Sequence, residues 1–507
     1  MNFLRELPAW VGMVPLLTLL ASLLMGLRQL SGRAMGDADE VMTARLASGS
    51  AFLAFLVLAL IDLSVWQHGW PGHRLLLVWF ASGEWSGNIS FLLDALSLPV
   101  ATLVALIGWL VMRFSVHYLH REAGFHRFFI VMGLFLTGMQ LVLLAGNALL
   151  AFVGWEMCGV ASFLLIGYAW QRPTATGNAL FAFVTNRAGD AGFLLALGFA
   201  GAWLASFEWP QLNAAQGLSL VAVRLLLIGF LLAALAKSAQ LPFTPWIVRA
   251  LEGPTPSSAI FYGAVMVHAG IYLLLRLSPL LQLVPDVLLG LLVLGSLTAV
   301  YAWLCGLVQT DVKSALIHAT VFQVALMLVA VGLGWNLWAE IHLCLHAAWR
   351  SWQFLLAPSW LVLTRTRPAP PPRWLARQQW LYNAALQGFW LDRIGDVLLV
   401  RPTRAFAQDA RGLEERFIDR LLGQPGQGKP LQEAQPLVVA DGLAGMALAH
   451  GAEKLQSLEN HLSLRGRGGL AEQALQRAGF YLRILENLLE QPRYLMMAVM
   501  ATFVVIL

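Results

Sequence analysis

The sequence has little charge and very little cysteine or lysine. Of its 507 residues, 12% are charged and 58% are hydrophobic, which excludes an ordinary soluble globular protein of this length. The three cysteines, Cys158, Cys305 and Cys344, fall in apolar runs without paired spacing. We interpret them as packing residues that carry no information about the redox compartment.

Cofactor motifs are missing as well. The sequence contains no nucleotide-binding loop, glycine-rich dinucleotide turn, cysteine cluster or haem motif. We therefore expect no cofactor and assign any redox or bond-making chemistry to another chain. The net charge of +5 comes from arginines beside apolar runs and in the C-terminal part. This distribution favours membrane topology and lipid headgroups over nucleic acid.

Long hydrophobic runs, by contrast, are abundant up to residue 363. Runs of about 20 residues are long enough to cross about 30 Å of hydrocarbon as helices. The expected helices cover residues 8–27, 48–66, 92–112, 128–146, 148–169, 178–204, 219–238, 256–276, 286–308, 313–333 and 339–363. These runs predict an all-α polytopic membrane protein.

The composition changes after this bundle of about eleven helices, which takes residues 1–363. Residues 364–373 form a connector rich in proline and arginine that cannot be helical. Residues 374–490 have the composition of amphipathic helices that lie on a membrane or a partner, with apolar side chains three and four apart near the end. Residues 491–507 contain a short apolar run that we expect to be a tilted or partly inserted membrane segment.

Four charged residues lie inside the apolar runs: Glu156, Arg187, Asp190 and Lys237. Each would be costly alone at membrane depth, but together they can neutralise one another inside a helical bundle. One interpretation is a buried ion pair that fixes the register of the helices. The other is a proton switch, because moving a carboxylate toward or away from a buried lysine changes the affinity of that lysine for its proton.

Two breaks interrupt the helical pattern near this cluster. Proline and glycine in residues 251–258, and Pro242 after Lys237, prevent continuous helices. Unpaired backbone at membrane depth is tolerated only where it is buried in protein or lines a wet cavity. His268 follows the segment at 251–258 and is a candidate proton relay, with hydrogen-bonded packing as the alternative.

A second set of polar residues follows further along the chain. Asp311 and Lys313 open an expected helix that also carries His318 and Gln323. His342, His346 and Arg350 are spaced by four and therefore share one helix face. Two histidines at this spacing could bind a metal, but no third ligand is evident. We therefore expect a proton-conducting polar stripe and no metal.

Several of these motifs together resemble a known family. They are GWE at 154–156, SFLLIG at 162–167, FVTNRAGD at 183–190, KSAQLPF at 237–243, GPTPSSA at 253–259 and DVK at 311–313. The chain resembles the subunit-L-type (subunit 5) proton-translocating membrane subunits of respiratory complex I, which are related to Mrp-type antiporters. LDRIGD at 391–396 and VRP at 400–402 resemble the segment ahead of the long lateral helix of that family.

The resemblance implies an antiporter-like bundle with interrupted transmembrane helices and C-terminal amphipathic helices, in the inner (cytoplasmic) membrane of a bacterium. It implies that Glu156 and Lys237 form the switching pair, that Arg187 and Asp190 modulate it, and that the break at 253–258 is accessible to water. Lys313, His342 and His346 extend the polar axis.

The sequence also departs from the family. Tyr262 stands where the family usually has a histidine, and His268 lies six residues further on, off that helix face. Arg350 replaces a lysine and can hold charge but cannot relay a proton. A second interrupted helix with a terminal lysine is not found before the connector, so we expect a truncated second half-channel.

Three functions remain open: a proton-conducting subunit that powers the reaction of a partner, a subunit that exchanges sodium or another cation, and a membrane anchor that has lost conduction. The family offers two partner contexts. One is the distal end of a complex I-type membrane arm. The other is a carbonic-anhydrase-like zinc protein in inorganic-carbon uptake, which the absence of the second interrupted helix narrowly favours.

Overall fold

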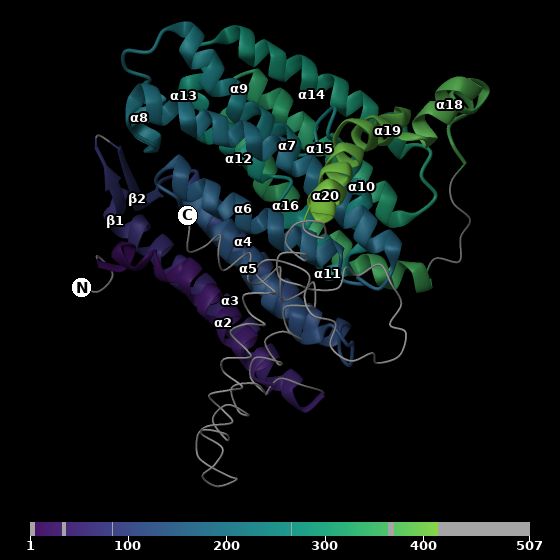
Figure 1. Ribbon diagram of the computed structural model, residues 1–507, viewed down its shortest axis with the longest axis horizontal. Helices are drawn as coiled ribbons and strands as arrows, with labels where there is room; N and C mark the ends of the chain where they lie inside the picture. The colour runs from purple at the N-terminus through teal and green to yellow at the C-terminus, as the bar shows by residue number, and fades with distance from the viewer. Residues whose placement is uncertain (1–5, 33–36, 84, 265, 364–369, 414–507) are drawn as a thin grey trace, which may run out of the picture. The chain divides into compact units, whose positions relative to one another are not determined.

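The computed structural model describes residues 6–32, 37–83, 85–264, 266–363 and 370–413, and it is helical in most of them. The chain divides into two compact units, residues 1–404 and 405–507. The first unit contains the helical bundle, one β-hairpin and a set of short helices (Figure 1). Only residues 405–413 of the second unit are described, as part of α20 (Arg401–Leu413).

Ten of the eleven runs expected from the sequence overlap long helices of the bundle, whereas the run at 256–276 is divided among shorter elements. The long helices are α2 (Met13–Leu30), α3 (Asp37–His68), α4 (Ser97–Tyr118), α5 (Phe125–Leu144), α6 (Ala148–Ile166), α7 (Pro173–Leu204), α9 (Leu220–Lys237), α14 (Pro285–Gly306), α15 (Val312–Gly332) and α16 (Asn336–Leu363). Within the described residues, nine helices are long and apolar enough to cross a membrane, namely all of these except α16. The protein is thus an all-α polytopic membrane protein.

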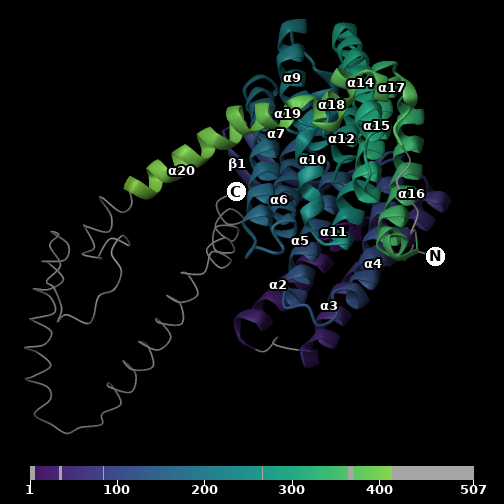
Figure 2. The ribbon, with the colours of Figure 1, turned by 90° about the vertical axis from the view of Figure 1, so that its right-hand side faces the viewer.

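Most of the helix contacts join helices that are close to each other in the sequence. Helix α5 contacts α2, α3 and α4, and α3 contacts α2 and α4. Helix α7 packs on α6 and α9, and α15 lies between α14 and α16 (Figures 1 and 2). The short helices α8 (Trp209–Ala214) and α13 (Ser278–Leu281) contact each other where α7 and α12 end. A 3-10 turn, η1 (Leu7–Trp10), precedes α2. Apolar side chains form one contiguous core through this bundle.

The interrupted segments have the irregular backbone that proline and glycine predict. After α9, Ala239 is left-handed (φ 51°) and a short helix α10 (Pro245–Arg249) follows. The next segment consists of η2 (Ala250–Glu252), α11 (Thr255–Ser258), the π-helix η3 (Ala259–Ala264) and α12 (Ala269–Arg276). Gly263 lets this segment lie against α16, because a Cβ there would overlap the backbone of Ser351.

A β-hairpin, which was not predicted from the sequence, lies between α3 and α4. Its strands are β1 (Gly72–Ser82) and β2 (Trp85–Leu93), which pair antiparallel. Glu208 ties this hairpin to the bundle: it accepts hydrogen bonds from Asn88 Nδ2 (2.9 Å) and Ser90 Oγ (2.9 Å) and pairs with His73 Nε2 (2.6 Å). The turn begins at Gly83 with a positive φ of 61°, a conformation that glycine adopts without strain.

Short helices follow the connector. They are α17 (Arg373–Arg377), α18 (Gln379–Leu386), η4 (Gly388–Trp390), α19 (Leu391–Gly395) and η5 (Asp396–Val400). Leu375 and Ala385 form a small apolar cluster with Val308, just beyond the end of α14, and Asp392 pairs with Arg249 at 3.5 Å. The amphipathic helix expected near residues 470–490 and the apolar run at 494–507 lie outside the described residues.

Candidate functional site

Lys237 is the last residue of α9, where the helix breaks inside the bundle. Its side chain is 1% exposed, and its ammonium donates to the Trp155 carbonyl at 3.2 Å and lies 4.9 Å from the centre of the Trp155 ring. Within the part of the chain that the structure describes, no carboxylate forms an ion pair with Lys237. The sequence therefore located a buried lysine, but its immediate partner is a backbone carbonyl and an indole.

Arg187 lies at the centre of the acidic cluster. It pairs with Glu156 on α6 and, at 2.6 Å, with Asp190 one turn further along α7. Asp190 also accepts a hydrogen bond from Trp155 Nε1 at 2.6 Å. Glu156 is thus placed against Arg187 and not directly against Lys237, the residue with which the family resemblance pairs it. The route from Glu156 to Lys237 passes through Arg187, Asp190 and Trp155.

Gly159 makes this arrangement possible, although sequence reasoning did not single it out. A Cβ at Gly159 would overlap Arg187 Nη2 and would lie 3.6 Å from Lys237 Nζ. The two cations therefore approach α6 where it has no side chain. The only signal in the sequence is the position of this glycine, one turn after Glu156 on the same helix.

The break before α11 has its own polar contacts. Lys313 Nζ donates to Thr255 Oγ1 at 2.7 Å, and the Tyr118 hydroxyl lies 3.0 Å from the same oxygen. Asp311, the N-cap of α15, accepts from the Ser314 amide at 2.8 Å. Lys313 was expected from the sequence to extend the polar axis, and its partner proves to be the threonine of the proline-rich break.

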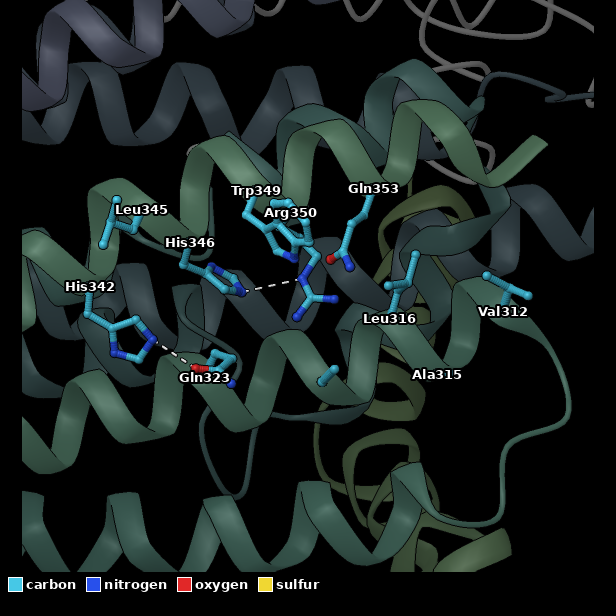
Figure 3. A pocket seen from close by; sticks show the side chains of 11 residues that line it. Val312, Ala315, Leu316, Gln323, His342, Leu345, His346, Trp349, Arg350 and Gln353 are labelled. Carbon is cyan, nitrogen blue, oxygen red and sulfur yellow. Dashed lines mark hydrogen bonds between the residues drawn. The ribbon is translucent and has the colours of Figure 1, made fainter. Parts of the chain in front are cut away.

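The histidines form a second centre. His268 Nε2 and His346 Nδ1 are 2.8 Å apart, and Arg350 Nε donates to His346 Nε2 at 3.4 Å. His342 Nε2 contacts Gln323 Oε1 at 2.8 Å. The sequence placed His342, His346 and Arg350 on one face of a helix, and Figure 3 shows His342, His346 and Arg350 on α16 directed toward α15.

His268 joins this face because the backbone before it is not a regular helix. The π-helix and turn between residues 259 and 268 shift the helical phase, so a count of 3.6 residues per turn misplaces His268. Tyr262, at the position where the family usually has histidine, donates to the Ile247 carbonyl at 3.0 Å. Within the described residues, no group of three or more histidine, cysteine or acidic side chains has the arrangement of a metal site.

A further ion pair was not predicted. Arg276, at the end of α12, pairs with Asp94 after β2 and donates to the Tyr272 hydroxyl at 3.0 Å. Arg276 is 7% exposed. Its position at the end of an apolar run was a signal that the sequence analysis did not use. Arg276, Asp94 and Tyr272 thus connect the end of β2 to α12, the last part of the interrupted segment.

Fold and site together define a multi-pass membrane protein whose interrupted helices carry charged residues in the bundle interior. Two family models match the chain: "NADH-Ubiquinone oxidoreductase (complex I), chain 5 N-terminus" at residues 79–129 and "NADH:quinone oxidoreductase/Mrp antiporter, TM" at residues 145–367. The chain belongs to this family of complex I subunit 5 and Mrp antiporter proteins.

Curated relatives carry the same names. The chain is 34% identical over 320 residues to NADH-ubiquinone oxidoreductase chain 5 of Dugong dugon (62% of this chain, 51% of the relative). It is 36% identical over 289 residues to NADH-quinone oxidoreductase subunit L of Mycobacterium tuberculosis (56% and 45%). The chain spans about half the length of the curated relatives it matches.

Solved structures show the same fold. A chain of the Mrp complex from Dietzia sp. superposes with a TM-score of 0.61 at 21% identity, covering 98% of this chain and 62% of that chain. A chain of the membrane-bound sulfane sulfur reductase, an archaeal respiratory membrane complex, gives a TM-score of 0.59 at 20% identity, covering 70% and 57%.

Proposed function

We propose that this protein is a proton-translocating, antiporter-like subunit of a complex I- or Mrp-type membrane assembly. The observation that carries the proposal is the series of charged and polar groups that runs through the bundle interior along the two helix breaks. It begins at Glu156 and Arg187, passes Lys237 and reaches the His268–His346 contact. Such residues inside a membrane protein mark ion pathways more often than packing.

Unpaired polar atoms support a hydrated path between Lys237 and His268. Ser238 Oγ, Gln240 Oε1, Ser258 Oγ and His268 Nδ1 are buried and have no hydrogen-bond partner among the described residues. Buried polar atoms in proteins are almost always satisfied, commonly by internal water. These four atoms belong to the two interrupted segments, so water bound to them would connect the lysine to the histidine pair.

The surroundings of Lys237 suit a switch. A carbonyl oxygen and an aromatic face stabilise the ammonium only modestly, since no carboxylate forms an ion pair with it in the described structure. Asp190 is one hydrogen bond away, through the Trp155 indole. A small movement of Asp190 or Arg187 would therefore change how firmly Lys237 holds its proton.

The choice of assembly follows the names of the relatives. They are subunits of NADH–quinone oxidoreductases and chains of an Mrp and a sulfane sulfur reductase complex. A carbonic-anhydrase-like partner and inorganic-carbon uptake have no counterpart among these names. We therefore propose the complex I- or Mrp-type assembly, in a bacterial cytoplasmic membrane, in place of the uptake system that the sequence alone narrowly favoured.

The experiment is proton uptake by the purified assembly in proteoliposomes. Lys237→Met should reduce coupled proton movement by about 100-fold or more, the contribution typical of a proton-transfer group. Lys237→Arg should fail as well, because arginine keeps the charge but does not release a proton. Arg224→Gln, an exposed change on the same helix, is the matched control and should remain active.

Full activity of assembled Lys237→Met would reject the switch. Replacement of sodium by an inert cation separates protons from sodium as the transported ion. Loss of activity on that replacement would support sodium exchange.

A further inference from the structure

We propose that the groove between α15 and α16 receives a transmembrane helix of a partner subunit, and that this helix carries a carboxylate that pairs with Arg350. The inference concerns assembly and does not depend on proton conduction. It rests on the shape of the groove, on a buried guanidinium without a counter-charge, and on the depth of that guanidinium along α16.

The groove has a volume of about 680 Å³ and lies along both helices (Figure 3). On α15 the lining includes two small residues one turn apart, Ala315 and Ala319, beside Val312, Leu316 and Gln323. On α16 the rim is large and apolar: Leu345 is 67% exposed and Trp349 is 57% exposed. Small residues four apart let a neighbouring helix approach closely, and bulky apolar residues beside them would pack against it.

Arg350 gives the groove a charge that nothing in the described structure balances. Its side chain is 5% exposed, and its one hydrogen bond to a described residue goes to His346 at 3.4 Å. The other strongly buried arginine, Arg276, meets a carboxylate, as does the partly buried Arg187. Among the described residues no carboxylate lies within ion-pair distance of Arg350. A guanidinium offers five N–H donors and favours a bidentate carboxylate.

A second polar atom in the groove is also unpaired. Gln353 Oε1 is buried and has no hydrogen-bond partner within the described residues. It lies three residues after Arg350 on the same helix face. A helix in the groove that brings one acidic and one hydrogen-bonding side chain would satisfy both groups.

The depth of Arg350 selects the occupant. It lies near the middle of α16, about 20 Å from either end at 1.5 Å per residue. Along α15, which is a candidate membrane span, the groove extends from Val312 at the start of the helix to Gln323 at its middle, farther than a lipid phosphate at the membrane surface reaches. The apolar run at residues 494–507 contains no acidic residue, and a symmetric second copy would bring another Arg350 to the first. The occupant that fits the groove is therefore a partner helix with an aspartate or glutamate in its middle.

Helix α14 shows what a lipid-facing surface of this protein looks like. Its exposed stripe is mainly aliphatic, with Leu289, Val293, Leu297 and Val300 all at least half exposed. Ser296 lies on the same stripe, but its hydroxyl donates to the Leu292 carbonyl of its own helix and needs no further partner. The groove beside α16 differs because its buried guanidinium has no counter-charge among the described residues, so α14 provides a matched control surface.

The test uses the full chain in its native assembly, with the photo-crosslinking amino acid p-benzoylphenylalanine at Leu345 and, as control, at Leu297. We expect Leu345 to crosslink to a transmembrane peptide of another subunit within one helical turn of an aspartate or glutamate. Leu297 should not crosslink to that peptide. Arg350→Glu should abolish the crosslink, Arg350→Lys should keep it, and exchange of the partner carboxylate for arginine should restore it in Arg350→Glu.

Four crosslinking results would overturn the proposal. These are crosslinks from Leu345 only to lipid, only to residues 414–507 of the same chain, only to a second copy, or to a segment without an acidic residue. Wild-type assembly of Arg350→Glu would also overturn it. Lys237→Met should leave the crosslink intact, so a failure of the conduction proposal and a failure of this one give different results.

Discussion

At the scale of single residues, Arg187 decides how Glu156 acts. Glu156 pairs with Arg187 and has no direct contact with Lys237. It therefore influences Lys237 indirectly, through the positions of Arg187 and Asp190. A carboxylate in this position tunes the lysine by holding Arg187 in place. Removing it would leave Arg187 to Asp190 alone and would draw that carboxylate away from Trp155.

Glu156→Gln should therefore reduce coupled proton movement strongly, whereas Glu156→Asp should retain part of it. The loss of stability should be less than the about 3–5 kcal/mol typical of breaking a buried pair, since Arg187 keeps Asp190. Proton uptake and thermal unfolding of the same purified assembly measure the two effects. Wild-type activity in both variants would reduce Glu156 to a packing residue.

Gly159 gives a second residue-scale prediction. Gly159→Ala places a methyl group on Arg187 Nη2, so Arg187 must shift away from α6. Overpacking of this kind costs about 1–3 kcal/mol, and the shift should lower activity by weakening the Glu156 pair. Gly198→Ala on α7 is the control, because a Cβ there meets nothing within 4 Å. Equal activity of the two variants would contradict this role.

Single-residue identity was the part of the site that the sequence could predict. A lysine or glutamate inside an apolar run is conspicuous because burial of a charge is costly. The contacts were not predictable, because Trp155 serves twice, through its carbonyl to Lys237 and its indole to Asp190. Neither interaction has a signature in composition or spacing.

At the scale of elements, the sequence predicted where the helices break but not the backbone conformation that follows each break. Proline and glycine predicted the breaks after Lys237 and at residues 253–258. The π-helix that follows was not predictable, and it moves His268 onto His346. The hairpin was missed because β1 is a continuous apolar run with exposed side chains, which has no strand alternation.

Thr255→Val tests whether the break at α11 is held by Lys313. The substitution keeps the shape of the side chain but removes the oxygen that accepts from Lys313 and contacts Tyr118. An unpaired donor costs about 1–3 kcal/mol, so thermal unfolding should occur at lower temperature. Thr255→Ser retains the hydroxyl and should unfold as the wild type does. An unchanged unfolding temperature for Thr255→Val would show that the contact contributes nothing.

At the scale of the whole molecule, the chain separates a bundle from a C-terminal part. Residues 373–400 return to the bundle, through the Leu375 and Ala385 cluster with Val308 and through the Arg249–Asp392 pair. The boundary between the two compact units falls later, at residue 404. Residues 373–404 therefore belong to the same compact unit as the bundle.

Truncation at these two places should separate stability from assembly. A chain ending after Arg404 keeps the Val308 cluster and the Arg249–Asp392 pair, so its bundle should unfold near the wild-type temperature. A chain ending before Pro368 loses both and should be less stable by about 1–3 kcal/mol, the value of burying one or two apolar side chains. Both chains should co-purify with partner subunits more weakly than the full chain does, because the amphipathic pattern of residues 404–490 has its apolar stripe to bury against lipid or another chain. Both keep the groove between α15 and α16, so the loss need not be complete. Insertion is checked by membrane extraction, stability by thermal unfolding and assembly by co-purification. An intact, active assembly from the chain that ends after Arg404 would show that the remaining residues are dispensable for partner binding.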